Sequence, residues 1–381
     1  MKRTLFTEEH NIFRDAFRKF LDKEVTPRHA AWEEQGFVPK EAWLKAGEQG
    51  FLCPWLPEEY GGSGVDFLYS VIEIEENARA RNHGFMMNLH SDIVVPYIAS
   101  FGNEEQKKKW LPGCVTGETI TAVAMTEPGA GSDLAGIKAT AVLDGDEYVI
   151  NGQKTFISCA LTCDLVVVAV KTDPKAQPAY TGISLIVVEK DAPGFSRGQK
   201  LKKMGLHAQD TGELYFEDCR VPKGNLLGAP GMGFMFLMQK LQQERLVCAI
   251  GAQAAGEMIL QECIQYCKER ELFGKPLAKF QNTRFKLAEM ATELEAGRWF
   301  IDKLIEEHVA GANIIKETCM SKWWHTELLK RVADECLQFY GGYGYMQEYN
   351  ICKDYVDVRV QTIYAGATEV MKEIIGRQMG L

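Results

Sequence analysis

Long apolar runs are missing from this chain: it contains no stretch of about 18 consecutive apolar residues, so we expect no membrane-spanning helix. The opening segment, MKRTLFTEEHNIFRDAF, starts with two basic residues, continues with acidic and polar ones, and lacks the apolar core of a secretory signal. We interpret this segment as a helix. Because no targeting segment is visible, we expect a cytoplasmic protein of bacterial type.

Positive charge is also scarce, because 43 Lys and Arg face 52 Asp and Glu, and the formal net charge is −9. This balance argues against a protein that mainly binds nucleic-acid phosphates. Zinc-ligand spacing is absent among the eleven cysteines, since Cys159/Cys163 and Cys263/Cys267 both lack a second Cys or His pair at that spacing. We therefore expect no metal site, and we interpret the cysteines as buried free thiols in a reducing compartment.

The period of the hydrophobic pattern changes twice along the chain, which predicts three structural regions. A chain of 381 residues exceeds the usual size of one core, so two or three subdomains are expected. Residues 1–118 have a helical pattern with Thr7 as an N-cap, and residues 228–381 contain long helical segments that indicate an antiparallel bundle. The predicted fold class is mainly α with a central β domain.

The central region, residues 119–227, consists of short β-branched or alternating runs bounded by turn residues, which predict about six or seven strands. Asp144-Gly145 and Asn151-Gly152 are dipeptides typical of tight turns between antiparallel strands. No helices alternate with these strands, which argues against a parallel nucleotide-binding sheet. We expect an antiparallel, barrel-like domain.

Two segments next to predicted strands could contact a cofactor. Residues 126–133, TEPGAGSD, contain glycines that let the backbone approach a ligand, and the hydroxyls of Thr126 and Ser132 can donate hydrogen bonds. An ordinary Gly-rich loop explains this segment as well, and it does not match the dinucleotide pattern GxGxxG. Phe156 could stack on a flat ring while Ser158 bonds the ring edge, although a core Phe beside a surface Ser is the commoner arrangement.

Charged residues of the C-terminal region also allow two interpretations. Arg270 ends a long helix, where a cation stabilises the helix dipole, but its planar guanidinium could instead pair with a phosphate. Glu244-Arg245 could be a solvated helix face. Apolar residues crowd both sides of this pair, however, and a carboxylate in apolar surroundings has a raised pKa, as a general base near neutral pH requires.

A series of strings in a fixed order resembles the acyl-CoA dehydrogenase family over essentially the whole chain. No single string decides the matter, but their joint order is highly specific. The resemblance implies a helical N-terminal domain, a central β domain and a C-terminal four-helix bundle. The matching strings are PEEYGGSG at 57–64, AMTEPGAGSDLAG at 124–136, INGQKTFIS at 150–158, MGLHAQDTGELYFEDCRVP at 204–222, QERL at 243–246, RELFGKPL at 270–277, QFYGGYGYMQEY at 338–349 and IYAGATEVMKEIIGR at 363–377.

The resemblance implies FAD as the cofactor and assigns its contacts position by position. Ser158 would lie near flavin N5, and Phe156 would stack on the ring where many members have Trp. The positions that match contacts to the flavin and the pyrophosphate in the same subunit are Met125, Thr126, Gly131, Ser132, Phe156 and Ser158. A neighbouring subunit would hold the ADP half of FAD, and this sharing implies a homotetramer built from dimers. The residues that match contacts to the ADP half are Arg270, Phe273, Gln281, Gln338 and Gly342. Ala367 replaces a Thr that usually contacts FAD; Thr368 and Glu369 could compensate.

The catalytic base implied by the resemblance depends on the branch of the family. In the commonest branch it is a Glu directly after the Tyr of the final motif, but that position is Ala365 here, and a methyl group cannot take a proton. The long-chain and isovaleryl branches place the base on the bundle helix just before an Arg, as Glu244 stands before Arg245. Glu244 is therefore the expected base. The resemblance also implies hydride transfer to flavin N5, release of a trans-2-enoyl-CoA and an electron-transferring flavoprotein as acceptor.

The substrate class stays open between an ordinary acyl-CoA and an alicyclic or branched one. Asp92 lies on a helix that borders the acyl pocket in this family; it could be an N-cap or a surface acid, or a second catalytic acid or base for an alicyclic substrate. The residues expected to contact substrate are Asp92, Ser132, Arg245, Tyr364 and Ala365. Two rival classes are an oxygen-reoxidised acyl-CoA oxidase, which is typically longer, and a flavin-binding or helical assembly protein without a base.

Overall fold

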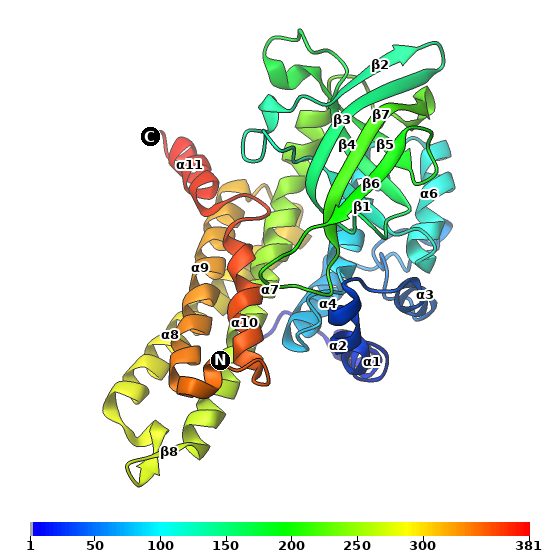
Figure 1. The fold of residues 1–381 in the computed structure, drawn as a ribbon. Helices are drawn as coiled ribbons and strands as arrows, with labels where there is room; N and C mark the ends of the chain where they lie inside the picture. The colour runs from blue at the N-terminus through cyan, green and yellow to red at the C-terminus, as the bar shows by residue number, and fades with distance from the viewer. Residues whose placement is uncertain (1–2) are drawn as a thin grey trace.

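The structure, a computed structural model, describes residues 3–381 and contains a helical region, a sheet and a second helical region in chain order (Figure 1). Met1 and Lys2, which begin the segment expected to be helical, lie outside the described residues. The first helix starts at Glu8, and Thr7 caps it as predicted, because its hydroxyl accepts from the backbone N–H of His10. No helix of the described residues has the length and apolar character needed to cross a membrane.

The N-terminal region is built from helices that pack against the sheet and against the later bundle. Two of its segments, η1 and η3, are π-helical, and the second runs directly into α5. The bounds are α1 Glu8–Phe20, η1 Leu21–Val25, α2 Thr26–Gln35, α3 Lys40–Glu48, α4 Phe67–Arg79, η3 Leu89–Val94, α5 Val95–Phe101 and α6 Glu104–Thr116.

The central region is a seven-stranded sheet with the order β1-β4-β2-β3-β7-β6, and β5 pairs with β4 outside this path. Most neighbours are antiparallel, but β1 and β2 each pair with β4 in parallel, so the expectation of a wholly antiparallel domain is wrong for these two pairs. The strands are β1 Thr121–Ala124, β2 Thr140–Asp144, β3 Glu147–Ser158, β4 Leu165–Lys171, β5 Ile183–Glu189, β6 Phe195–Lys200 and β7 Thr211–Pro222.

Only one of the two predicted turn dipeptides is a turn. Asp144-Gly145 joins β2 to β3 as an antiparallel hairpin, with Asp144 opposite Glu147. Asn151-Gly152 instead lies inside β3, where the register with β7 shifts between Ile150 and Gly152. Gly152 has φ 150°, and a Cβ at this position would lie 2.5 Å from the Cβ of Ala139, so the glycine makes room for the bulge.

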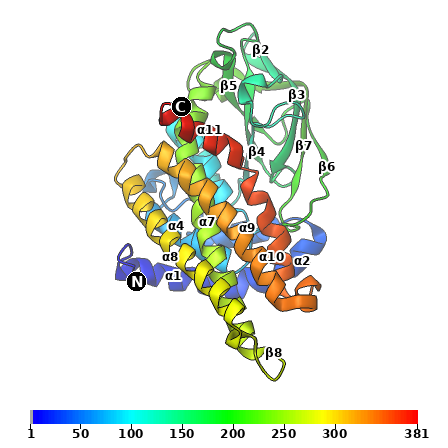
Figure 2. The same ribbon diagram turned by 90° about the vertical axis from the view of Figure 1, so that its left-hand side faces the viewer.

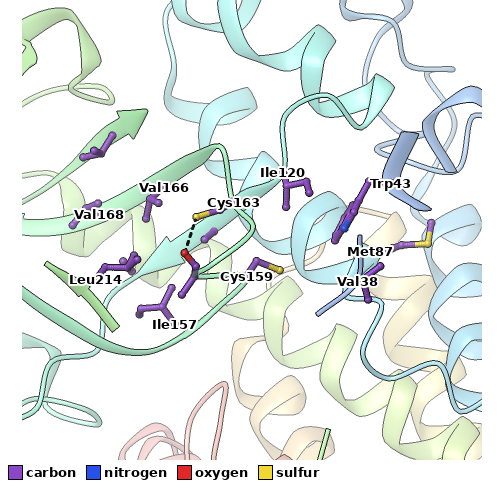
Figure 3. Packing of buried hydrophobic residues seen from close by; sticks show 14 of the residues in the cluster. Val38, Trp43, Met87, Ile120, Ile157, Cys159, Cys163, Val166, Val168 and Leu214 are labelled. Atoms are coloured by element: carbon purple, nitrogen blue, oxygen red, sulfur yellow. Dashed lines mark hydrogen bonds between the residues drawn. The ribbon is translucent and has the colours of Figure 1, made fainter. Parts of the chain in front are cut away.

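Strand β4 is buried on both faces and joins two hydrophobic cores. Val166 and Val168 point into a core shared with Trp43, Ile120 and Leu214, as Figure 3 shows. The alternate residues of the strand, Leu165, Val167 and Ala169, point into a second core with helices α5, α6 and the start of α7. The sheet is thereby fixed between the N-terminal helices and the first helix of the bundle.

The C-terminal region contains three long helices with α10 packed beside α9, as the bundle prediction required (Figure 2). Helix α7 has 37 residues and is therefore about 55 Å long. A short hairpin, β8–β9, follows it at the end of the bundle far from the sheet (Figure 1). The bounds are α7 Gly233–Glu269, β8 Glu271–Leu272, β9 Lys275–Pro276, α8 Gln281–Val309, α9 Ile315–Tyr340, α10 Asn350–Val358 and α11 Thr368–Gln378.

Candidate active site

Glu244 lies in the part of α7 nearest the sheet, with its side chain turned inward. It is only 5% exposed, so the alternative of a solvated helix face is wrong. The hydroxyl of Tyr97, on α5, donates a hydrogen bond to Glu244 Oε1 over 2.6 Å. This contact holds one carboxyl oxygen in place and leaves the other available to a substrate.

The surroundings of Glu244 raise the pKa of its carboxyl group into the range suited to a general base. Burial raises its pKa to about 7, although the Tyr97 hydroxyl and the charges of Arg245 and Lys240 act in the opposite direction. Burial also raises the pKa of Tyr97 well above its ordinary value, so the phenol stays protonated and keeps its donor role. A carboxyl group with a pKa near the working pH is suited to accept a proton.

Arg245 is buried beside Glu244, with 4% of its surface exposed. Its guanidinium Nη1 donates to the Cys319 sulfur over 3.2 Å, and its Nε has no hydrogen-bond partner among residues 3–381. Arg245 forms no ion pair with a carboxylate within this part of the chain. The charge of Arg245 therefore lowers the pKa of Glu244, and its guanidinium Nε–H is available for a further hydrogen bond.

The loop after α10 reaches the same part of α7. Ala365 and Gly366 both have left-handed backbone, with φ 51° and 94°. The ammonium group of Lys322, which is fully buried on α9, donates to the Gly366 carbonyl over 2.6 Å. Burial and the neighbouring thiol of Cys248, one turn after Glu244 on α7, raise the pKa of Tyr364 well above its usual range. Tyr364 therefore lies beside Cys248 of α7, whereas the substrate contacts expected of Tyr364 and Ala365 stay predictions.

The Gly-rich loop at the end of β1 is held by a buried ion pair that the sequence did not reveal. Lys154 Nζ donates to Glu127 Oε1 over 2.8 Å and to the Met125 carbonyl over 3.0 Å. Glu127 also accepts the backbone N–H groups of Lys138 and Ala139. These contacts fix both ends of the loop, while Gly131 and Ser132 at its tip are exposed. A Cβ at Gly131 would meet nothing within 4 Å, so the tip has room for a bound group.

Phe156 and Ser158 lie at the end of β3, next to this loop. The Thr155 N–H donates to the Thr126 carbonyl over 2.9 Å, which ties the two segments together. Phe156 is 68% exposed at φ 58°, so it is not the core Phe of the commoner arrangement. Its apolar ring on the surface, at a strained backbone position, fits a stacking surface for a flat cofactor. The Ser158 hydroxyl accepts from Gln209 Nε2 over 2.6 Å.

The residues expected to hold the ADP half of FAD lie far from this loop within one chain. They gather around the β8–β9 hairpin and the neighbouring end of α9, at the far end of α7 (Figure 1). All of them are exposed, with Phe273 at 95%, and they are Arg270, Phe273, Gln281, Gln338 and Gly342. Thr368 is 7% exposed and its hydroxyl donates to Glu327, whereas Glu369 is exposed.

Asp92 is neither an N-cap nor a surface acid. It lies within the π-helical segment η3 and is 1% exposed. Burial raises its pKa to about 7. Its backbone carbonyl accepts from Gln243 Nε2 over 2.7 Å, which places it against the residue preceding Glu244. The sequence pointed to this side chain but did not predict its burial.

Sequence comparisons place the chain in one family of known proteins. Models of the acyl-CoA dehydrogenase N-terminal, middle and C-terminal domains match residues 7–118, 122–219 and 231–380. The long-chain specific mitochondrial acyl-CoA dehydrogenase of Mus musculus is 46% identical over 377 residues, 99% of this chain and 88% of that protein.

Solved structures agree with the sequence comparison. The acyl-CoA dehydrogenase from Geobacillus kaustophilus is 58% identical, with a TM-score of 0.99 and 100% of both chains covered. A glutaryl-CoA dehydrogenase from Mycobacterium smegmatis in complex with FADH2 is 28% identical, with a TM-score of 0.91 over 98% of this chain and 95% of that one. The chain belongs to the acyl-CoA dehydrogenase family and is an FAD-dependent oxidoreductase that acts on acyl-CoA.

Proposed function

We propose that Glu244 removes the α-proton of an acyl-CoA thioester and that the product is the trans-2-enoyl-CoA. The chemistry that FAD supplies when bound is acceptance of the β-hydride at flavin N5. The observation that carries the proposal is the buried Glu244 carboxyl, whose pKa is raised to about 7 while Tyr97 holds one oxygen. Desolvation by the acyl chain would strengthen this base, because its charged form loses water.

The loop around Ala365 would polarise the thioester carbonyl in this proposal. The Ala365 N–H would donate to the thioester carbonyl, together with the ribityl 2′-hydroxyl of the cofactor. Donors aimed at a developing enolate oxygen lower the effective pKa of the α-proton. Tyr364 and Arg245 would line the same end of the substrate site, and Ser132 would contact the substrate from the Gly-rich loop.

The cofactor would lie against Met125, Thr126, Phe156 and Ser158, with its pyrophosphate at Gly131 and Ser132. The ADP half would be held by a second subunit, because the residues expected to bind it lie at the far end of the roughly 55 Å helix α7. No single FAD could reach both groups of residues within one chain. This separation supports a cofactor site shared between two subunits, as the expected homotetramer built from dimers would contain.

The test is anaerobic titration of the FAD-loaded enzyme with a panel of straight, branched and alicyclic acyl-CoAs, following bleaching of the flavin band. Glu244→Gln is expected to keep FAD and acyl-CoA binding but to lower the rate of bleaching by about 10²–10⁴-fold or more. Glu105→Gln, an exposed acid on α6, serves as the matched control and should bleach at the parent rate.

Bleaching of Glu244→Gln at close to the parent rate would show that another group is the base. The second candidate function is dehydrogenation of an alicyclic or branched acyl-CoA with Asp92 as a second acid or base. Its buried carboxyl, with a pKa raised to about 7, favours this candidate, and its backbone carbonyl accepts from Gln243, the residue before Glu244. The reduced enzyme should be reoxidised rapidly by an electron-transferring flavoprotein and slowly by air; the opposite order would indicate an oxidase.

A further inference from the structure

A second group of buried acids lies at the junction of three elements around Glu244. Glu73 is on α4 and is 4% exposed, and Asp92 is on η3 and is 1% exposed. Ser70, one turn before Glu73 on α4, is fully buried. Both α4 and η3 pack against α7, the helix that holds Glu244. We call Ser70, Glu73 and Asp92 the acid cluster.

The acid cluster has more acceptor atoms than donors. Oε1 of Glu73 has no hydrogen-bond partner within residues 3–381, and the nearby Ser70 hydroxyl is the one side-chain donor that acts on the Asp92 carboxyl in this part of the chain. Buried polar groups are almost always paired, so each exception requires a reason. Glu75, also on α4 and fully buried, shows the usual arrangement, because arginines surround it.

The two carboxyls of the acid cluster lie close enough to influence each other. Burial raises the pKa of Glu73 well above its ordinary value, and the neighbouring charge of Asp92 raises it further. Two like groups that share such a site do not both ionise readily. The pair therefore presents several acceptor oxygens and a reduced negative charge, which is a suitable environment for a hydroxyl or an ammonium group.

The position of the acid cluster connects it to the reacting end of the substrate. The amide of Gln243, the residue before Glu244, donates to the Asp92 carbonyl over 2.7 Å. Tyr97, which holds Glu244, follows Asp92 in the continuous η3–α5 segment. π-helical segments such as η3 occur frequently at functional sites. The backbone of Asp92 therefore lies against the turn of α7 that carries Glu244, where the α-carbon of the substrate would lie under the proposed function.

We propose that Ser70, Glu73 and Asp92 bind a hydrogen-bond-donating group on the acyl chain, a hydroxyl or a protonated amine, and thereby select polar-substituted acyl-CoA substrates. This inference rests on the proposed dehydrogenation at Glu244. An unsubstituted hydrocarbon would leave the buried oxygens unpaired, whereas an O–H or N–H group on the chain satisfies them. A site built to pair with such a group discriminates strongly against the analogue that lacks it.

The first arm of the test uses the unaltered, FAD-loaded enzyme. It is assayed with acyl-CoAs of equal chain length that are unsubstituted, or carry a hydroxyl or an amino group at successive carbons beyond the β-carbon. At its best position, one substituted series is expected to show a kcat/KM about 100-fold above the unsubstituted chain. The series that gains, hydroxyl or amino, identifies the donor. Equal or lower kcat/KM at every position would overturn the proposal.

The second arm replaces the acids. Glu73→Leu/Asp92→Leu removes unpaired buried carboxyls and is expected to fold, and the preference for the substituted chain should fall at least about tenfold. Asp92→Asn, which keeps the shape, should lower the preference for an amine more than that for a hydroxyl. Ser91→Ala is the control from the same segment, because the Ser91 hydroxyl accepts from the Cys53 N–H outside the acid cluster. An unchanged preference in Asp92→Asn and the double variant would overturn the proposal.

The two proposals fail in different ways. Bleaching by unsubstituted chains without any preference removes the polar-chain proposal and leaves Glu244 as the base. Failure of every acyl-CoA in the panel to bleach the flavin removes the dehydrogenation itself.

Discussion

At the residue scale, the acidity of Glu244, the proposed base, depends on its partner as much as on its own position. Tyr97 donates to Glu244 over 2.6 Å, and this bond lowers the pKa of the carboxyl against the larger effect of burial. The phenol is thus expected to set the pH at which the enzyme becomes active. Arg245, buried without a carboxylate partner among the described residues, acts in the same direction.

Replacement of Tyr97 by Phe removes this donor. Because the hydrogen bond no longer lowers the pKa of Glu244 against the effect of burial, this pKa should rise further. The base must be deprotonated to act, so the acidic limb of the kcat/KM profile should move to higher pH by about one pH unit. Activity at pH 7 should fall several-fold and recover at higher pH. Steady-state kinetics across the pH range measure this. Tyr180→Phe, a half-exposed tyrosine of the middle domain, is the control. An unmoved limb in Tyr97→Phe would contradict the role.

The sequence could identify Glu244 as the expected base through the family resemblance, because the local Glu-Arg pair in an apolar helix was also compatible with a solvated face. It could not identify Tyr97, which lies 147 positions away, or Lys154, whose partner Glu127 is on another segment. Side-chain pairs between distant segments depend on the packing of whole elements. The same reason hid the burial of Asp92, because its local sequence is equally compatible with a surface acid.

At the element scale, the loop at Ala365 is held in an unusual shape by one cation. Ala365 and Gly366 have positive φ, and the Gly366 carbonyl accepts from the buried Lys322 on α9. Left-handed backbone at a residue with a side chain costs free energy, so it persists only where other contacts hold it. Lys322 is therefore expected to position the Ala365 N–H for the thioester carbonyl without contacting the substrate.

Lys322→Met keeps the length of the side chain and removes the donor. If the loop loses its shape, the N–H moves away from the carbonyl, and kcat should fall about tenfold or more while KM changes less. Stopped-flow bleaching at saturating acyl-CoA measures this rate, and the FAD content should stay at the parent level. Thr326→Val is the control, because the Thr326 hydroxyl donates only to carbonyls of its own helix. A loss of FAD without a change in kcat per bound flavin would indicate a purely structural role.

The pairing of the strands is a second feature that could be predicted only in part from the sequence. The sequence predicted about six or seven strands and a turn at Asp144-Gly145 from local patterns, and the structure contains a seven-stranded sheet and that hairpin. The parallel pairs of β4 with β1 and β2, and the bulge at Gly152, are not local properties. They arise where distant strands meet, and Gly152 is needed there because Ala139 lies against it.

At the scale of the whole molecule, a buried network of ion pairs joins the N-terminal helices to the bundle. Glu75 on α4 accepts from Arg298 on α8 over 2.6 Å and from Arg14 on α1 over 3.1 Å. Arg298 also bonds Glu257 on α7. The order of helical, β and helical regions was predictable from periodicity. This network was not, because Glu75 and Arg298 are 223 positions apart.

Glu75 is the central anion of this network, and its ionisation links stability to pH. Burial by itself raises the pKa of Glu75, but the charges of Arg298, Arg3 and Arg79 outweigh it and lower the pKa to about 2. An unfolded Glu has a pKa of about 4.3, so the stabilisation from Glu75 is fully present above that pH. It is lost as the pH falls from about 4.3 towards 2.

Glu75→Gln should lower the free energy of unfolding at pH 7 by about 3–5 kcal/mol, because it leaves buried arginines without their shared anion. The difference between variant and parent should shrink as the pH falls from about 4.3 towards 2, where the parent begins to lose the same charge. Denaturant unfolding followed at several pH values measures both effects, and Glu59→Gln at an exposed acid should match the parent throughout. Glu75 connects α1, α4 and α8. If the difference in the free energy of unfolding stays constant down to pH 2, the packing of the side chain, and not its charge, stabilises the contact between the two helical regions.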